Sequence, residues 1–259
     1  MSAPARIGVV TGASSGIGRA SALALARAGV HVHVTVADVD SAGGEETVAM
    51  ITATGGAADF AHCDVSVGAD VAALVEGIVE RHGRLDVAHN NAGICPVGFT
   101  IDTLEEDQWD RVIGINLKGV WLSMKYELAV MREQRSGAIV NTSSVCGLRP
   151  SSMTVPYNTS KHGVIGLTQE AALDFSPLGI RVNAVLPGVI DTAMAHGIAS
   201  DSQIAEMGEA TPMRRVGQAE EIAAAVAWLL SDEASYVTGH SMVVDGGLAL
   251  PLPSSVSPR

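Results

Sequence analysis

The chain has 259 residues, of which 47% are hydrophobic and 17% charged, which excludes a disordered chain and suits one large α/β domain. Its net charge of −12 argues against nucleic acid or an anionic membrane as a partner. Neither a signal peptide pattern nor an apolar run of membrane length occurs, so we expect a cytoplasmic protein.

Strand-like apolar runs alternate with helical patterns along the chain. The predicted strands are Ile7–Val10, His31–Ala37, Ala57–His62, Leu85–His89, Ala138–Asn141, Ile180–Val185 and Ser241–Val244. The predicted helices are a first helix through Ala28, then Glu45–Ala53, Val67–Arg81, Leu104–Arg132, Tyr157–Phe175 and Ala219–Leu230. This alternation predicts a single α/β domain over residues 1–250, a doubly wound parallel sheet of about seven strands with helices on both faces. The Pro- and Ser-rich tail, residues 251–259, is expected to be loosely held.

A glycine-rich segment, Gly12-x-x-x-Gly16-x-Gly18, joins the first strand to the first helix. Glycines there allow a tight turn, close approach of the backbone to a pyrophosphate, and close packing of the helix on the strand. The free N–H groups of the helix N-terminus attract phosphates. Ser14 and Ser15 add hydroxyl donors, with helix capping as the alternative role. The segment therefore predicts a nucleotide site.

An acidic residue strengthens this prediction. Asp38 lies twenty residues beyond Gly18, at the end of the second strand, where a ribose-binding carboxylate belongs in a dinucleotide fold. Repulsion between this carboxylate and a 2′-phosphate about 4 Å away costs roughly 1–4 kcal/mol. We therefore expect NAD rather than NADP, with Arg19 as the residue most able to soften the preference, and a solvated loop aspartate as the alternative interpretation.

The stretch Ser143–Lys161 carries the chemistry. Tyr157 and Lys161 are four residues apart, so on a helix the phenol and the ammonium share one face. A free phenol has a pKa of about 10, and a cation near 4 Å supplies roughly the 4 kcal/mol that would lower this pKa to about 7. The pair is therefore a candidate general acid/base, although an ordinary helix start with a surface lysine shows the same spacing.

Taken together, these segments resemble those of the short-chain dehydrogenase/reductase family, and the resemblance extends through about Leu248. It implies a Rossmann-like fold. The matching cofactor segments are Thr11-Gly12-x-x-x-Gly16-Ile17-Gly18, Asp64-Val65, Asn91-Ala92-Gly93 preceded by Asn90, and Pro187-Gly188 with Ile190 and Thr192. The matching catalytic residues are Asn116, Ser144, Tyr157 and Lys161. Ser143 is the weaker candidate for the catalytic serine.

The resemblance implies a mechanism. Tyr157 exchanges a proton with the hydroxyl of a neutral secondary alcohol while hydride passes to the nicotinamide of NAD. Lys161 lowers the tyrosine pKa and holds the nicotinamide ribose, and Ser144 donates a hydrogen bond to the substrate oxygen. Asn116 would hold a water that connects Lys161 to solvent. No metal is implied, because no metal-ligand spacing joins the three cysteines to the eight histidines.

The surroundings of the site are less defined. Residues 193–212 occupy the place of the family's substrate lid and lack basic residues before Arg214, which favours a neutral substrate. Cys95 and Cys146 are interpreted as small buried hydrophobes, with a place beside the substrate as the alternative. Met153, Met194 and Met207 are expected in an adaptable apolar wall or in the core.

The resemblance also implies a homotetramer. Small residues on the helix of Tyr157 permit close packing between helices of two chains: Gly163, Gly166, Ala171 and Ala172.

Two alternatives remain open. The first is a 3-oxoacyl-carrier-protein reductase, against which stand Asp38 and the acidic Glu170 and Asp174 on the helix of Tyr157. The second, of another class, is a catalytically silent NAD-binding redox sensor. Such proteins tend to lose the tyrosine or the serine, and both are present here.

Overall fold

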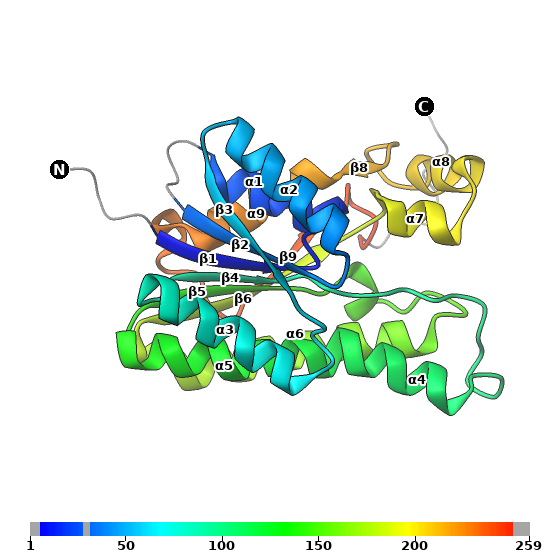
Figure 1. Ribbon diagram of the computed structural model, residues 1–259. Coiled ribbons are helices and arrows are strands. Elements are labelled where there is room, and N and C mark those ends of the chain that lie inside the picture. Colours follow the sequence, from blue (N-terminus) through cyan, green and yellow to red (C-terminus); the bar gives the residue numbers. More distant parts are fainter. Residues whose placement is uncertain (1–5, 28–31, 251–259) are drawn as a thin grey trace.

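A seven-stranded parallel sheet forms the centre of the computed structural model, which describes residues 6–27 and 32–250 (Figure 1). The strand order is β3-β2-β1-β4-β5-β6-β9. The strands are β1 (Arg6–Thr11), β2 (Val32–Asp38), β3 (Ala57–His62), β4 (Val87–Asn90), β5 (Gly137–Thr142), β6 (Ile180–Pro187) and β9 (Ser241–Val244). A separate two-stranded ribbon pairs β7 (Ile190–Asp191) with β8 (Gly217–Gln218).

Helices cover both faces of the sheet (Figure 1). One face carries α1 (Gly16–Ala26), α2 (Ser41–Ala53) and α9 (Ala219–Leu230). The other carries α3 (Gly68–His82), α4 (Glu106–Ile113), α5 (Gly119–Gln134) and α6 (Val155–Phe175). Two short helices, α7 (Ala193–Ile198) and α8 (Asp201–Glu209), lie beyond the carboxyl ends of the strands. None of the helices within the described residues has the length and apolarity needed to cross a bilayer.

Two apolar layers explain this architecture. Alternate strand residues point to opposite faces, so each face of the sheet presents its own row of β-branched and aliphatic side chains. Val10, Val34 and Val36 belong to the layer beneath α1 and α9, while Val9 and Ile139 belong to the layer against α3, α5 and α6. Burial on both faces is typical of a parallel sheet, and the predicted fold class is confirmed.

The strand order predicts where a crevice for a ligand lies. β1 lies between β2 and β4, so the chain leaves β1 toward one edge of the sheet and continues from β4 toward the other. Loops that follow the two halves diverge at such a switch point and leave a crevice outside the carboxyl ends of the strands.

Two sequence predictions need correction. The predicted helix Leu104–Arg132 is interrupted by a π-helical turn, Gly114–Lys118, between α4 and α5. The segment 193–212, which has weak periodicity, forms α7 and α8, whose N-termini are capped by the side chains of Thr192 and Ser200. The other predicted elements end within four residues of their observed bounds, and Ala28, His31 and the tail 251–259 lie outside the described residues.

A buried polar network joins β4, β5, α5 and α6. The Asn90 side-chain amide donates to Glu127 Oε2 and to Asn141 Oδ1, each at 3.0 Å, and Asn141 donates to Thr168 at 3.0 Å. All four side chains are buried. Burial raises the pKa of Glu127 to about 7, although the hydrogen bond from Asn90 partly opposes the shift. Glu127 therefore gains a proton on folding between pH 4.5 and 7.

Glu127→Gln is expected to stabilise the protein at alkaline pH only. Because the folded pKa is raised, the folded state binds more protons than the unfolded state between the two pKa values, so the wild type loses stability as pH rises through that window. The neutral amide avoids this loss, which amounts to at most about 3 kcal/mol above about pH 8. Calorimetric melting at about pH 5 and about pH 8.5 measures it. Glu133→Gln, at an exposed position of α5, is the matched control, and an equal destabilisation of Glu127→Gln at both pH values would contradict the account.

Candidate active site

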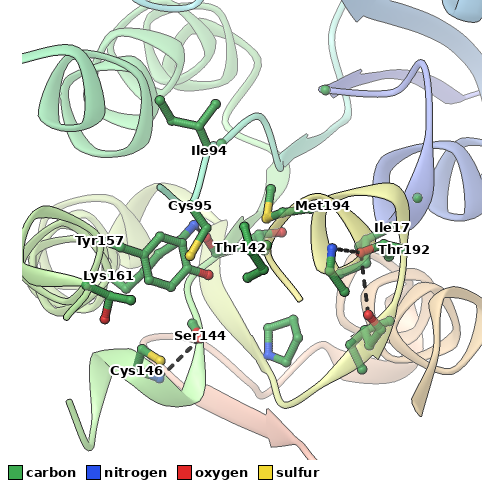
Figure 2. A pocket seen from close by; sticks show the side chains of 18 of the residues that line it. Ile17, Ile94, Cys95, Thr142, Ser144, Cys146, Tyr157, Lys161, Thr192 and Met194 are labelled. Atoms are coloured by element: carbon green, nitrogen blue, oxygen red, sulfur yellow. Dashed lines mark hydrogen bonds between the residues drawn. The ribbon is translucent and has the colours of Figure 1, made fainter. Parts of the chain in front are cut away.

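A cavity of about 1640 Å³ opens at the carboxyl ends of the strands. Figure 2 shows Tyr157, Lys161 and Cys95 on one side of it and Ile17 and Thr192 on the other. Its volume exceeds the 300–1,000 Å³ of ordinary small-molecule pockets. The cavity therefore has room for a dinucleotide and a substrate together.

The glycine-rich segment forms one wall. Gly12 (φ 64°) and Gly16 (φ 51°) adopt the left-handed conformation that glycine tolerates best, and both line the cavity. Gly18, also a predicted cofactor residue, does not itself line the cavity. A Cβ at position 18 would lie 2.0 Å from the Gly12 carbonyl oxygen, so Gly18 allows α1 to pack against the end of β1. Its role is therefore to shape the segment.

Asp38 ends β2 at the same wall. Its Oδ2 accepts a hydrogen bond from the backbone N–H of Ser14 at 2.9 Å, and its Oδ1 accepts one from Asp40 at 3.0 Å. Arg19, the cation that could soften a preference for NAD, is held by Glu46 and by the backbone carbonyls of Ser14 and Gly43. Arg19 therefore does not line the cavity, whereas Asp38 does.

All the other predicted cofactor residues line the cavity. The predicted residues that line the cavity are Gly12, Ser14, Ser15, Gly16, Ile17, Asp38, Asp64, Val65, Asn91, Ala92, Gly93, Tyr157, Lys161, Pro187, Gly188, Ile190 and Thr192. Asn91 also holds the site together. Its side-chain amide donates to the carbonyls of Thr11 and Gly12, and its oxygen accepts from the Thr142 hydroxyl at 3.2 Å.

The helix α6 presents Tyr157 and Lys161 on one face. The Lys161 ammonium is buried and lies 5.4 Å from the centroid of the Tyr157 ring. It donates a hydrogen bond to the carbonyl of Thr142, at the end of β5, at 2.8 Å. Thr142 was not predicted from the sequence, although its place just before the serine pair marks it as a strand end. Its hydroxyl lies 2.8 Å from His89 Nε2.

The two titratable groups shift in opposite directions. Burial raises the pKa of the Tyr157 phenol, the neighbouring Cys95 raises it further, and a hydrogen bond with Ser144 lowers it. Burial lowers the pKa of Lys161 to about 8. Desolvation of the phenolate therefore opposes the predicted lowering of the tyrosine pKa by Lys161. Tyr157 is a neutral acid at pH 7.

The serine pair divides its roles. Ser144 lines the cavity between β5 and α6, and its Oγ accepts a hydrogen bond from the Cys146 N–H at 3.1 Å (Figure 2). The Ser143 hydroxyl donates instead to the buried backbone carbonyl of Lys161 at 2.7 Å. Ser144 is thus the serine that lies beside Tyr157, whereas Ser143 binds the backbone of α6 at Lys161.

Asn116 lies at the middle of the π-helical turn. Its Oδ1 accepts from the backbone N–H of Ile94 at 2.9 Å, and its Nδ2 donates to the carbonyl of Ile94 at 2.8 Å. It is fully buried and does not line the cavity. A π turn inserted in an α-helix often accompanies a functional site. Here it aims an asparagine at the segment that follows β4.

Several apolar side chains line the other end of the cavity: Cys95, Cys146, Met153, Met194 and Met207. The interpretation of the two cysteines as core residues alone is wrong, because both are only half-buried and face the cavity. Burial raises the pKa of Cys95 to about 11, so its thiol is neutral at pH 7. Residues of α7 and α8 that the sequence did not single out, Ile198 and Ile204, complete this apolar wall.

The donor set fits a nicotinamide dinucleotide. Positive-φ glycines and the start of α1 stand at the place of a pyrophosphate, with the Asp38 carboxylate one strand away at the place of a ribose. At Gly93 a Cβ would come within 3.4 Å of Asn116 Oδ1 and 3.6 Å of Lys161 Nζ, so glycine keeps the space beside the lysine open.

Comparison with known proteins decides the family. A family model described as enoyl-(acyl carrier protein) reductase matches residues 12–249. A short chain dehydrogenase/reductase from Aspergillus oryzae is 43% identical over 250 residues, covering 95% of each chain. The chain belongs to the short-chain dehydrogenase/reductase family. Cyclohexanol dehydrogenase from Acinetobacter sp. is 42% identical and covers 93% of this chain and 94% of that relative.

Solved structures of this short-chain dehydrogenase/reductase family superpose closely. A levodione reductase structure matches with a TM-score of 0.91 at 39% identity, covering 94% of this chain and 97% of that one. An actinorhodin polyketide ketoreductase with NADPH matches with a TM-score of 0.90 at 34% identity, covering 95% and 98%. The family uses a nicotinamide cofactor, NAD or NADP, which confirms that the predicted cofactor is a nicotinamide dinucleotide.

Proposed function

We propose that this protein is an NAD-dependent oxidoreductase that transfers hydride between NAD(H) and an apolar, neutral secondary alcohol or ketone. The observation that carries the proposal is the convergence of Ser144, Tyr157 and Lys161 at one end of a cavity whose other wall holds the glycine segment and Asp38. Relatives named cyclohexanol dehydrogenase and levodione reductase support the chemistry.

The roles of the chain's own residues follow from their positions. A bound nicotinamide supplies the hydride acceptor or donor. Tyr157, neutral at pH 7, gives its phenol proton to a ketone oxygen in reduction and recovers it in oxidation. Ser144 donates a hydrogen bond to the same oxygen, on which negative charge develops. Lys161 stabilises the phenolate that Tyr157 becomes, and Asn116 holds the segment at Ile94 beside them. A water between Asn116 and Lys161 stays a prediction.

The lining supports an apolar substrate. The thiols and thioethers at this end of the cavity offer little hydrogen-bonding capacity. The cationic Arg149 lines the cavity too, but it donates to the carbonyls of Ala249 and Leu250. We infer that residues 193–212, with α7 and α8, form the substrate cover of a single domain, residues 1–250. Their side chains Met194, Ile198 and Met207 support this role because they line the cavity.

Asp38→Asn is expected to shift the cofactor preference toward NADP. Removal of the carboxylate abolishes the repulsion of a 2′-phosphate, so the ratio of kcat/KM for NADP to that for NAD rises roughly ten- to several-hundred-fold. Steady-state rates with both cofactors measure it. Asp40→Asn is the matched control, because the Asp40 side chain caps α2. An unchanged ratio in Asp38→Asn would show that another group selects the cofactor.

A homotetramer is also proposed, although its predicted basis changes. Gly163 packs against Leu117 of its own chain, and Ala171 and Ala172 lie in the core, so these three are unavailable to a partner, whereas Gly166 is exposed with open space beside it. Further support comes from Trp121 on α5 and Leu173 on α6, which are apolar and exposed. Light scattering measures the state, and a monomer alone would remove the proposal. A cytoplasmic location stays a prediction.

A 3-oxoacyl thioester ketoreductase is the second candidate. The likeness to a polyketide ketoreductase with NADPH favours it. One experiment separates the two: NADH production from apolar cyclic alcohols against NADPH consumption with acetoacetyl thioesters. The proposal predicts that the first reaction has the higher kcat/KM. Bound NAD with no turnover in either arm would favour a redox sensor.

A further inference from the structure

A second polar cluster lies on β2 and β3, away from the carboxyl ends of the strands, where the cavity opens. His33 of β2, Asp59 of β3 and His82, the last residue of α3, offer three ligand atoms within 4.8 Å of one another. His33 precedes Asp38 by five residues, which places the cluster roughly 16 Å along the strand from the cofactor end. The cluster is therefore separate from the chemistry described above.

The fold directs the three side chains toward one point. Asp59 is in register with Thr35, two residues from His33, so His33 and Asp59 point to the same face of the sheet. The helix α3 covers that face, and the C-terminal turn of α3 carries His82 (Figure 1). The rings of His33 and His82 lie 4.4 Å apart between centroids. Two strands and one helix thus converge on a single carboxylate.

The separations suit a tetrahedral metal ion. Bonds of about 2.1 Å at tetrahedral angles place neighbouring ligand atoms roughly 3.4 Å apart. His33 Nε2 lies 3.3 Å and His82 Nε2 lies 3.8 Å from the same oxygen, Asp59 Oδ2. The second distance is too long for a hydrogen bond. A metal between these atoms would replace the hydrogen bond between His33 and Asp59 and would give His82 Nε2 a partner.

Two orphaned atoms point the same way. His82 Nε2 and Asp59 Oδ1 are both buried, and neither has a hydrogen-bond partner among the residues that the structure describes. A buried polar atom without a partner destabilises the folded state. The negative end of the α3 dipole also favours a cation at this point. Arg81 Nε, 3.7 Å from Asp59 Oδ2, is the competing neighbour.

We propose that His33, Asp59 and His82 form a structural site for a divalent transition metal, zinc foremost, with water as the fourth ligand. Two imidazoles and one carboxylate are ligands that Zn²⁺ prefers. The ion links the edge strand β3 to β2 and to the C-terminal end of α3. It stabilises the fold and takes no part in hydride transfer.

Zinc titration of the full chain, without an affinity tag and after removal of metals by a chelator, tests the proposal. At about pH 7.5, where histidine is ordinarily neutral, calorimetry should give one Zn²⁺ per chain. Zinc at roughly 100 times its Kd should raise Tm by about 5 °C or more. Cobalt should give the visible absorption of a tetrahedral site.

His82→Ala and Asp59→Asn should each weaken zinc binding at least about 10²-fold and abolish the Tm shift. His240→Ala, an exposed histidine before β9, is the matched control and should bind as the wild type does. Absence of zinc binding by the wild type, or binding that survives both variants, would overturn the proposal. The cluster would then be an ion-pair network of Asp59 with Arg81 and the two histidines.

Discussion

Tyr157→Phe is expected to lower kcat by about 10³-fold while NAD binding changes little. The phenol is the group placed to exchange the proton of the substrate oxygen, and general acid–base catalysis by one side chain contributes about 10²–10⁴-fold. The ring is retained, so the packing of Tyr157 against Cys95 and Lys161 should persist. Initial rates of NADH formation, with NAD affinity measured by fluorescence, check both parts.

The matched control for this variant is Tyr126→Phe. Tyr126 is a half-buried tyrosine of α5 that packs against the core, so its loss of a hydroxyl should leave turnover close to that of the wild type. Turnover by Tyr157→Phe within about tenfold of the wild-type rate would assign the proton transfer to another group.

Lys161→Met is expected to lower kcat/KM for alcohol oxidation by about 10²-fold. The ammonium lies 5.4 Å from the Tyr157 ring centroid. At that separation and an effective dielectric of about 20, its attraction to a phenolate is roughly 3 kcal/mol, or about 10²-fold in rate. Methionine keeps the length of the side chain and removes the charge. The variant also loses the hydrogen bond to the Thr142 carbonyl.

The pH profile distinguishes an electrostatic role of Lys161 from a merely structural one. Without the cation, the apparent pKa that governs oxidation should rise by about 2 units, since each unit corresponds to 1.36 kcal/mol. Lys125→Met is the matched control, because Lys125 is an exposed lysine that also lies near aromatic rings, those of Trp121 and Tyr126. An unshifted profile in Lys161→Met, together with a lower melting temperature, would assign Lys161 to stability alone.

The order of strands and helices could be predicted because the strands are short runs, most of them rich in β-branched residues, that alternate with helical apolar patterns. The π-helical turn at Asn116 could not, because one extra residue in a turn hardly disturbs the spacing of apolar side chains over Leu104–Arg132. The helices α7 and α8 were missed although Ser200 and Gln203 form a capping box, a signal that the sequence does carry.

The candidate site was predictable where one segment carries the chemistry, and less so where distant segments meet. Tyr157 and Lys161 share a helix, so their proximity follows from the spacing. The contact of Arg19 with Glu46, which keeps its guanidinium out of the cavity lining, depends on packing between α1 and α2. The raised pKa of Tyr157 depends on burial, which the spacing does not reveal. The cluster of His33, Asp59 and His82 likewise exists only through tertiary contacts.

The most direct test of the central claim follows the hydrogen itself. The apolar cyclic alcohol with the highest kcat/KM would be prepared with deuterium on its carbinol carbon and incubated with the enzyme and NAD. Direct hydride transfer predicts that deuterium appears at C4 of the nicotinamide in the NADH formed, and that the Tyr157→Phe enzyme forms almost none. Binding of NAD without NADH formation from any apolar cyclic alcohol, or deuterium released to water, would contradict the account.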